Sequence, residues 1–93
     1  MQKYIQVKVT DFLRQMEGYI DGKIGVDDYC QGIFALMKRR MTISDEECRI
    51  LQTAFHDADD YDAEIRLEHT ILEPELRRRV ATSIEELRAL GHQ

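Results

Sequence analysis

Residues 2–22 read QKYIQVKVTDFLRQMEGYIDG, and the spacing of their apolar side chains indicates how the chain folds. The apolar positions recur every three or four residues and therefore share one helix face; they are Ile5, Val9, Phe12, Leu13, Met16, Tyr19 and Ile20. Gly22 follows, and glycine adopts at little cost the left-handed conformation that ends many helices. The pattern predicts an amphipathic helix over residues 2–20.

Two more amphipathic stretches follow in the middle of the chain. A helix is expected over residues 26–40, and its core-facing side chains would be Tyr29, Cys30, Ile33, Phe34 and Met37. Ser44 and Glu47 have the spacing of a capping box, in which each side chain accepts a backbone hydrogen bond at the start of a helix. A third helix is therefore expected over residues 45–58, with Cys48, Leu51, Ala54, Phe55 and Ala58 on its apolar face.

The last helix is expected over residues 74–90. Pro74 suits a first helical turn, because the N–H that proline lacks would have no partner there. Leu76, Val80, Ile84 and Leu87 follow at helical spacing, and Gly91 ends the stretch. Four amphipathic helices with mostly short links predict an all-α fold, an antiparallel four-helix bundle that forms one domain over residues 1–93. The basic clusters 38–40 and 77–79 are expected on solvated helix faces.

The composition limits the class of protein. The 93 residues are 43% hydrophobic and 33% charged, which is ordinary for a compact domain with a single core. The first residues do not resemble a signal peptide, and no stretch approaches the roughly 18 apolar residues of a membrane span. Cys30 and Cys48 have no paired C-x-x-C spacing, which favours small buried side chains over a disulfide or metal site. We expect a cytoplasmic protein that is a monomer when free.

Residues 57–68 carry the whole net charge of −5. The segment holds six acids against the single base Arg66, while the rest of the chain holds twelve acids and twelve bases; the six acids are Asp57, Asp59, Asp60, Asp62, Glu64 and Glu68. Such a concentration of like charge speeds encounter with a cationic partner. The alternative is a solvated acidic loop that contributes only to solubility.

Other chemistries fit this segment poorly. In a calcium loop that began at Asp57, Tyr61 and Asp62 would occupy the fifth and sixth positions, where a ligand and a glycine are required. His56 stands without a nucleophile motif and is expected to be a solvated group. An acidic protein also lacks the basic footprint needed for direct binding to nucleic acid. We therefore expect no enzyme activity, no cofactor and no metal.

Several short motifs resemble the colicin D immunity protein family. In the first half they are Phe12-Leu13, then Tyr19-Ile20-Asp21-Gly22-Lys23-Ile24, then Tyr29. In the second half they are Ile50-Leu51, Phe55, Ala58-Asp59-Asp60-Tyr61 and Glu73-Pro74-Glu75-Leu76-Arg77. Each motif is weakly specific alone, but their order and spacing are similar to the family's over residues 11–90.

The resemblance implies a small four-helix protein that protects a bacterium from a nuclease toxin, either a colicin or a contact-dependent growth inhibition toxin. In the family's type member the toxin cleaves transfer RNA, and the immunity protein covers its positively charged active site. The closest counterparts of the family's toxin-contacting acids are Asp59 and Glu64. Asp57, Asp60, Asp62 and Glu68 are further candidates, and Tyr61 is either an interface anchor or a core residue. The implied partner is a cognate nuclease domain in a 1:1 complex, with no membrane involved.

A rival hypothesis is a helical adaptor or regulatory domain whose acidic segment binds an unrelated basic protein. A purely structural role is a third option, although no heptad pattern continues long enough for a coiled coil. A neighbouring reading frame that ends in a basic nuclease domain would favour the immunity hypothesis over the adaptor.

Overall fold

The computed structural model describes residues 8–39, 42–61 and 70–92 of the chain. Within these ranges it contains four α-helices, α1 (Val9–Ile20), α2 (Val26–Met37), α3 (Asp45–Asp60) and α4 (Glu73–Ala89), and no strand beyond one isolated β-bridge. The predicted all-α fold is confirmed. No helix in the described part of the chain combines the length and the apolar character needed to cross a lipid bilayer.

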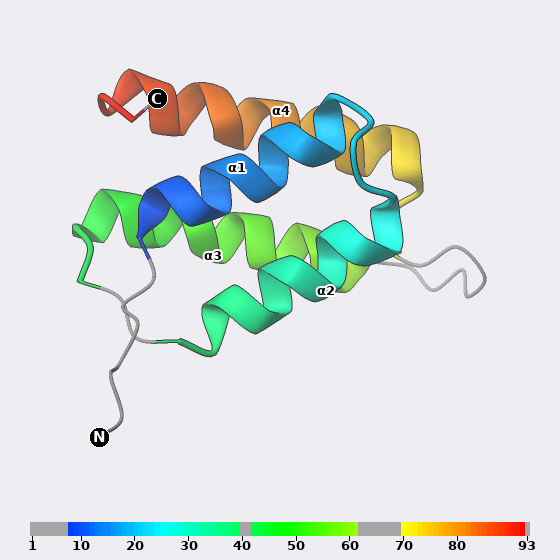
Figure 1. The fold of residues 1–93 in the computed structure, drawn as a ribbon, viewed down its shortest axis with the longest axis horizontal. Helices are drawn as coiled ribbons and strands as arrows, with labels where there is room; N and C mark the ends of the chain where they lie inside the picture. The colour runs from blue at the N-terminus through cyan, green and yellow to red at the C-terminus, as the bar shows by residue number, and fades with distance from the viewer. Residues whose placement is uncertain (1–7, 40–41, 62–69, 93) are drawn as a thin grey trace.

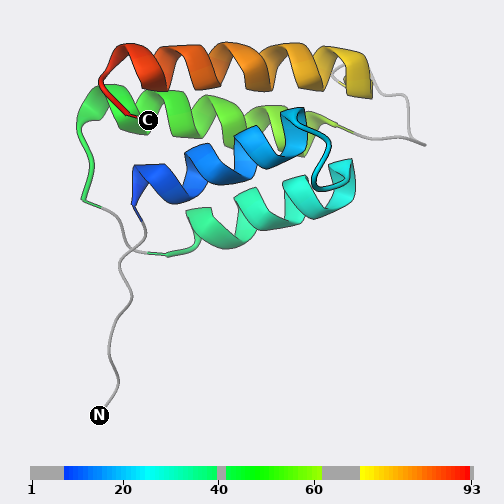
Figure 2. The same ribbon diagram turned by 45° about the horizontal axis from the view of Figure 1, so that its top comes forward.

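The four helices form a bundle in which successive helices run in opposite directions, as the colour sequence in Figures 1 and 2 shows. Each helix packs chiefly against two neighbours: α1 and α3 both contact α2 and α4. The short link between α1 and α2 enforces an antiparallel pair, because it is too short for any other connection. The antiparallel four-helix bundle predicted from the sequence is therefore the observed architecture.

The core consists of side chains that all four helices turn inward. The largest fully buried side chains are Phe12, Leu13, Met16, Tyr19, Tyr29, Ile33, Ile50, Leu51, Leu76, Val80 and Leu87. The apolar stripes predicted for α1 and α4 are confirmed by this burial, except that Ile20 is only partly buried. Ile5 lies outside the described residues.

Two helix boundaries differ clearly from the prediction. Lys8 has an extended backbone, so α1 begins at Val9 and not at residue 2. The Asp11 carboxylate accepts the Lys8 backbone N–H at 2.9 Å and thereby caps the helix at this point. The second difference is the end of α2, which stops at Met37 and not at residue 40. The Arg39 N–H donates to the Leu36 carbonyl there, which makes a turn tighter than that of an α-helix.

The other helix ends agree with the predicted boundaries to within two residues. The Ser44 hydroxyl accepts the Glu47 N–H at 3.2 Å, and the Glu47 carboxylate accepts the Ser44 N–H at 2.8 Å, which is the predicted capping box. α3 continues two residues beyond its expected end, to Asp60, and α4 spans Glu73–Ala89 where residues 74–90 were expected. Gly22 has a φ of 79° after α1, in the left-handed region.

Arg77 ties α4 to the end of α1 and does not lie on a solvated face, contrary to the expectation for the second basic cluster. Its guanidinium donates hydrogen bonds to the Ile20 carbonyl at 2.8 Å and to the Tyr19 carbonyl at 3.3 Å. These carbonyls belong to the last turn of α1. Carbonyl groups in a last turn lack hydrogen-bond partners within the helix and carry partial negative charge. The guanidinium carbon also lies 4.9 Å from the centre of the Tyr19 ring. One arginine thus caps a neighbouring helix.

We expect Arg77→Ala to lower the free energy of unfolding by about 2 kcal/mol, because hydrogen bonds from charged donors contribute about 1.5–3 kcal/mol. Urea unfolding followed by circular dichroism would measure the change. Arg78→Ala is the matched control: Arg78 is exposed, and among the described residues its ion pair is with Glu75, so a much smaller loss is expected. Equal losses in the two variants would contradict the capping role of Arg77.

Candidate functional site

The acidic residues at the end of α3 point to different sides of the helix. Asp57 and Asp59 are two positions apart and hence separated by about 200° around the helix axis. Asp57 is only 6% exposed and faces α4, whereas Asp59 is exposed and faces the α2 side. Asp57 and Asp59 therefore belong to two separate features in three dimensions.

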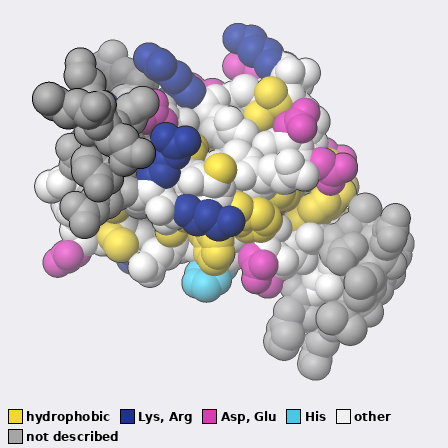
Figure 3. Space-filling view, turned by 60° about the horizontal axis from the view of Figure 1, so that its bottom comes forward, with side chains coloured by type: hydrophobic (Ala, Val, Ile, Leu, Met, Phe, Trp, Pro, Cys, Tyr) yellow, Lys and Arg dark blue, Asp and Glu magenta, His cyan; other side chains and the backbone are white. Residues whose placement is uncertain are grey.

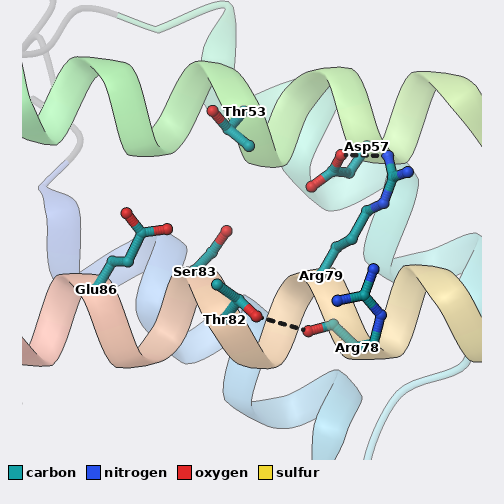
Figure 4. A pocket seen from close by; sticks show the side chains of 7 residues that line it. All are labelled: Thr53, Asp57, Arg78, Arg79, Thr82, Ser83 and Glu86. Carbon is teal, nitrogen blue, oxygen red and sulfur yellow. Dashed lines mark hydrogen bonds and ion pairs between the residues drawn. The ribbon is translucent and has the colours of Figure 1, made fainter.

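Asp57 belongs to an ion-pair network between α3 and α4 (Figure 4). One oxygen of its carboxylate accepts a hydrogen bond from Arg79 at 3.1 Å, and the same guanidinium donates to Glu75 at 3.0 Å. Burial raises the pKa of Asp57, and the nearby Arg79 opposes that rise. A buried, paired carboxylate is held by the fold, so Asp57 is not an exposed acid of the kind expected at a binding surface.

The same network lines a polar groove of about 290 Å³ between the two helices. Its walls are formed by Thr53, Asp57, Arg78, Arg79, Thr82, Ser83 and Glu86, which Figure 4 shows. Arg78 pairs with Glu75, and Arg79 pairs with both Glu75 and Asp57, so two carboxylates balance the charge of the two arginines. The groove is thus a packing feature of the helix pair and presents no unpaired cation to an anionic ligand.

The pairing of Glu75 predicts a pH dependence of stability. Hydrogen bonds from Arg78 and then Arg79 lower the pKa of Glu75 from 4.5 to about 2. Since the folded-state pKa lies below the unfolded value, this carboxylate stabilises the fold above pH 4.5, and the contribution is lost as pH falls towards 2. Glu75→Gln should therefore flatten the loss of stability in this window, as measured by urea unfolding at several pH values. An unchanged slope would contradict the pairing.

On the opposite side of α3 lies an apolar groove of about 450 Å³. Phe34 and Met37 of α2 and Phe55 of α3 line it, with Lys38 on the α2 side and Asp59 on the α3 side. The two phenylalanine rings meet edge to face, with centroids 5.4 Å apart. Figure 3 shows apolar side chains gathered on this face, with basic and acidic side chains around them. We call this feature the α2–α3 groove.

Asp59 makes no ion pair within residues 8–39, 42–61 and 70–92. It is exposed and sits in the last turn of α3, where the helix dipole disfavours negative charge by about 0.3–1 kcal/mol. The exposed His56 lies three residues before Asp59, and its ring packs against Phe55 with centroids 5.6 Å apart. The fold gains nothing evident from a carboxylate at this position.

The remaining candidates at this end of the bundle are placed as follows. Asp60 is partly buried, and its carbonyl accepts the Ile71 N–H at 3.0 Å. Tyr61 is partly buried against the core and forms the isolated β-bridge with Ile71, which favours the core interpretation of its ring. Asp62, Glu64 and Glu68 lie outside the described residues.

The groove was not foreseen, because Phe34, Met37 and Phe55 were all expected to face the core. They are only partly buried. A signal was nevertheless present: Phe34 and Met37 are three residues apart on α2 and therefore share one helix face. Surplus apolar surface beside an unpaired charge is typical of a protein-binding surface.

Neither a metal site nor an activated cysteine is evident among the residues that the structure describes. No group of three His, Cys, Asp or Glu side chains in this part of the chain is placed to hold a metal ion. Burial raises the pKa of the Cys30 thiol to about 11, which disfavours the reactive thiolate. Cys48 is partly buried and, like Cys30, is not in a disulfide.

No family model, curated protein or solved structure matches this chain. The resemblance to immunity proteins therefore rests on the short motifs alone.

Proposed function

We propose that this chain is an immunity protein that binds a cognate bacterial nuclease toxin, a ribonuclease that cleaves transfer RNA, and inhibits it by covering its basic active site. The observation that carries the proposal is Asp59, an exposed carboxylate that the described fold leaves without an ion pair, at the edge of an apolar groove. Such a combination of an apolar centre and a charged edge is the usual anatomy of a protein interface.

The chemistry of a ribonuclease explains why an acidic surface would inhibit it. A cleft that holds RNA must bind a polyanion, so it is lined with lysine, arginine and histidine. Carboxylates on an inhibitor can occupy these cations through charge-assisted hydrogen bonds, in place of the phosphates. Coupling between close charge pairs at a nuclease–inhibitor interface reaches about 1.5–7 kcal/mol, so a few acids can dominate the affinity.

The pattern of pairing within the bundle supports this role for Asp59. Several carboxylates on the helices pair within the fold: Glu46 and Glu86 pair with Arg49, Glu17 pairs with Arg88, and Asp57 pairs with Arg79. Exposed acids such as Asp27, Asp28 and Asp45 make no ion pair with a described residue, but they lie in first helical turns, where the helix dipole favours negative charge. Asp59 lies at the unfavourable end of its helix and makes no ion pair with a residue that the structure describes. Residues that lower local stability without a structural benefit are commonly found at functional sites.

The proposed complex has one copy of each protein, forms in the cytoplasm and needs no cofactor. The apolar groove would supply desolvated contact area, and Asp59 would supply attraction and register. We include Glu64 in the proposed surface only because the family resemblance singles it out.

The direct test is co-expression of this chain with the nuclease domain encoded immediately upstream, with growth and transfer-RNA integrity as readouts. Rescue by the unmodified chain and its loss in the Asp59→Asn/Glu64→Gln double variant are expected. The Asp45→Asn variant, which loses the same charge at the far end of α3, should still rescue growth. Absence of rescue by a folded, unmodified chain would overturn the proposal and favour the adaptor hypothesis.

A further inference from the structure

The two sides of the α2–α3 groove differ in charge, while its floor is apolar. Phe34, Met37 and Phe55 form the apolar part, Lys38 lies on the α2 side, and Asp59 lies on the α3 side. We infer that this groove receives one arginine side chain of the nuclease, whose aliphatic stem packs on the apolar floor while its guanidinium pairs with Asp59. The inference rests on the proposed function and names the contact through which the partner is recognised.

The lining of the groove matches both halves of an arginine side chain. Long cationic side chains bury their methylene stems along apolar surfaces and keep the charged group at a polar edge. A guanidinium also stacks on aromatic rings and binds a carboxylate through two parallel hydrogen bonds. Phe34 and Phe55, which meet edge to face with centroids 5.4 Å apart, give the groove an aromatic lining, and Asp59 offers a carboxylate that pairs with no described cation.

The charges also decide between arginine and other occupants. A purely aliphatic side chain would desolvate Asp59 without giving it a partner, which costs free energy. An acidic side chain would meet a like charge on the α3 side. A second copy of this chain carries the same net charge of −5 and would bring further negative charge to an acidic end of the bundle. Lys38 repels a cation on its side and so directs the guanidinium towards Asp59.

Methyl NMR of the full chain, labelled with ¹³C at its methionine methyl groups, tests whether the groove is filled. The probe is the purified nuclease domain encoded immediately upstream. On binding, the Met37 methyl resonance should shift, while that of Met16, which is 0% exposed in the core, should stay in place. Binding with no change at Met37 would overturn the groove contact but leave the proposed function standing. Absence of any binding would overturn both.

The same titration separates the possible occupants. The Met37 resonance could also shift when the concentration of this chain is raised without nuclease. That result would show that a second copy fills the groove, and it would overturn the inferred arginine contact. The matched surface control is Leu90→Ala, because Leu90 is an apolar side chain of 45% exposure that follows α4 and does not line the groove. This variant should bind the nuclease as tightly as the unmodified chain.

A double-mutant cycle tests whether one side chain spans the groove. Asp59→Asn is expected to weaken nuclease binding about thirtyfold and Met37→Ala about fivefold. If both residues contact the same arginine, the double variant should lose only about thirty- to fiftyfold, because each replacement removes part of one shared contact. A loss near 150-fold, the product of the single effects, would show independent contacts and overturn the inference.

Discussion

Replacing Tyr19 with alanine is expected to lower the free energy of unfolding by about 3–5 kcal/mol, the loss typical for removing a large buried aromatic side chain. Domains of this size have a total stability of about 5–15 kcal/mol, so the variant should be marginally folded or unfolded. Tyr19 is only 1% exposed and lies at the end of α1, where its side chain contacts α2 and α4.

The large effect follows from three separate contacts of this one side chain. Its ring stacks on Tyr29 of α2, with centroids 4.8 Å apart and planes 17° from parallel. Its hydroxyl donates to the Glu73 carboxylate at 3.0 Å, at the start of α4. Burial, followed by this hydrogen bond to Glu73, raises the pKa of Tyr19, so the hydroxyl keeps its proton and remains a donor. Arg77 covers the ring from α4.

Urea and thermal unfolding of Tyr19→Ala and Tyr19→Phe would separate these contacts. Tyr19→Phe keeps the stacked ring and loses only the hydroxyl, so about 1 kcal/mol is expected, the usual contribution of one hydrogen bond. Similar losses for the two variants would mean that the hydrogen bond, and not the ring, provides most of the stabilisation.

The stability of this corner of the bundle was only partly predictable from the sequence. The helical spacing places Tyr19 on the apolar face of α1, and burial confirms that. The contacts from Glu73 and Arg77 could not be predicted, because they depend on how α4 lies against α1 in space. The spacing of apolar residues determines which face of a helix is buried, but not which polar side chain of another helix reaches its end.

The candidate site shows the same division between local and tertiary information. Counting charges locates the acidic end of α3 without any structure. The sequence also contained an overlooked signal that Asp57 differs from Asp59: Asp57 lies three residues after the buried Ala54, on the same helix face. Its partner Arg79 lies 22 positions further along the chain, and only the packing of α3 on α4 brings the two together.

Asp59→Asn is expected to weaken binding to the cognate nuclease by about 2 kcal/mol, or about thirtyfold in Kd, while leaving the stability of the bundle unchanged or slightly higher. Loss of an interfacial carboxylate leaves a cation of the partner desolvated and unpaired, which costs about 2–5 kcal/mol when the pair is buried. The edge position of Asp59 favours the lower end of that range. Stability should not fall, because the carboxylate opposes the dipole of α3 and makes no ion pair with a described residue.

Binding kinetics at several salt concentrations would give the sharpest measurement of this effect. Asp59→Asn should lower the association rate and flatten its dependence on salt, because one charge that steers the encounter is lost. Asp45→Asn loses an equal charge in the first turn of α3, about 21 Å away along the helix, and should leave the Kd unchanged. If both variants weaken binding equally, net charge alone attracts the nuclease and Asp59 makes no specific contact. If neither does, the interface lies on another face of the bundle.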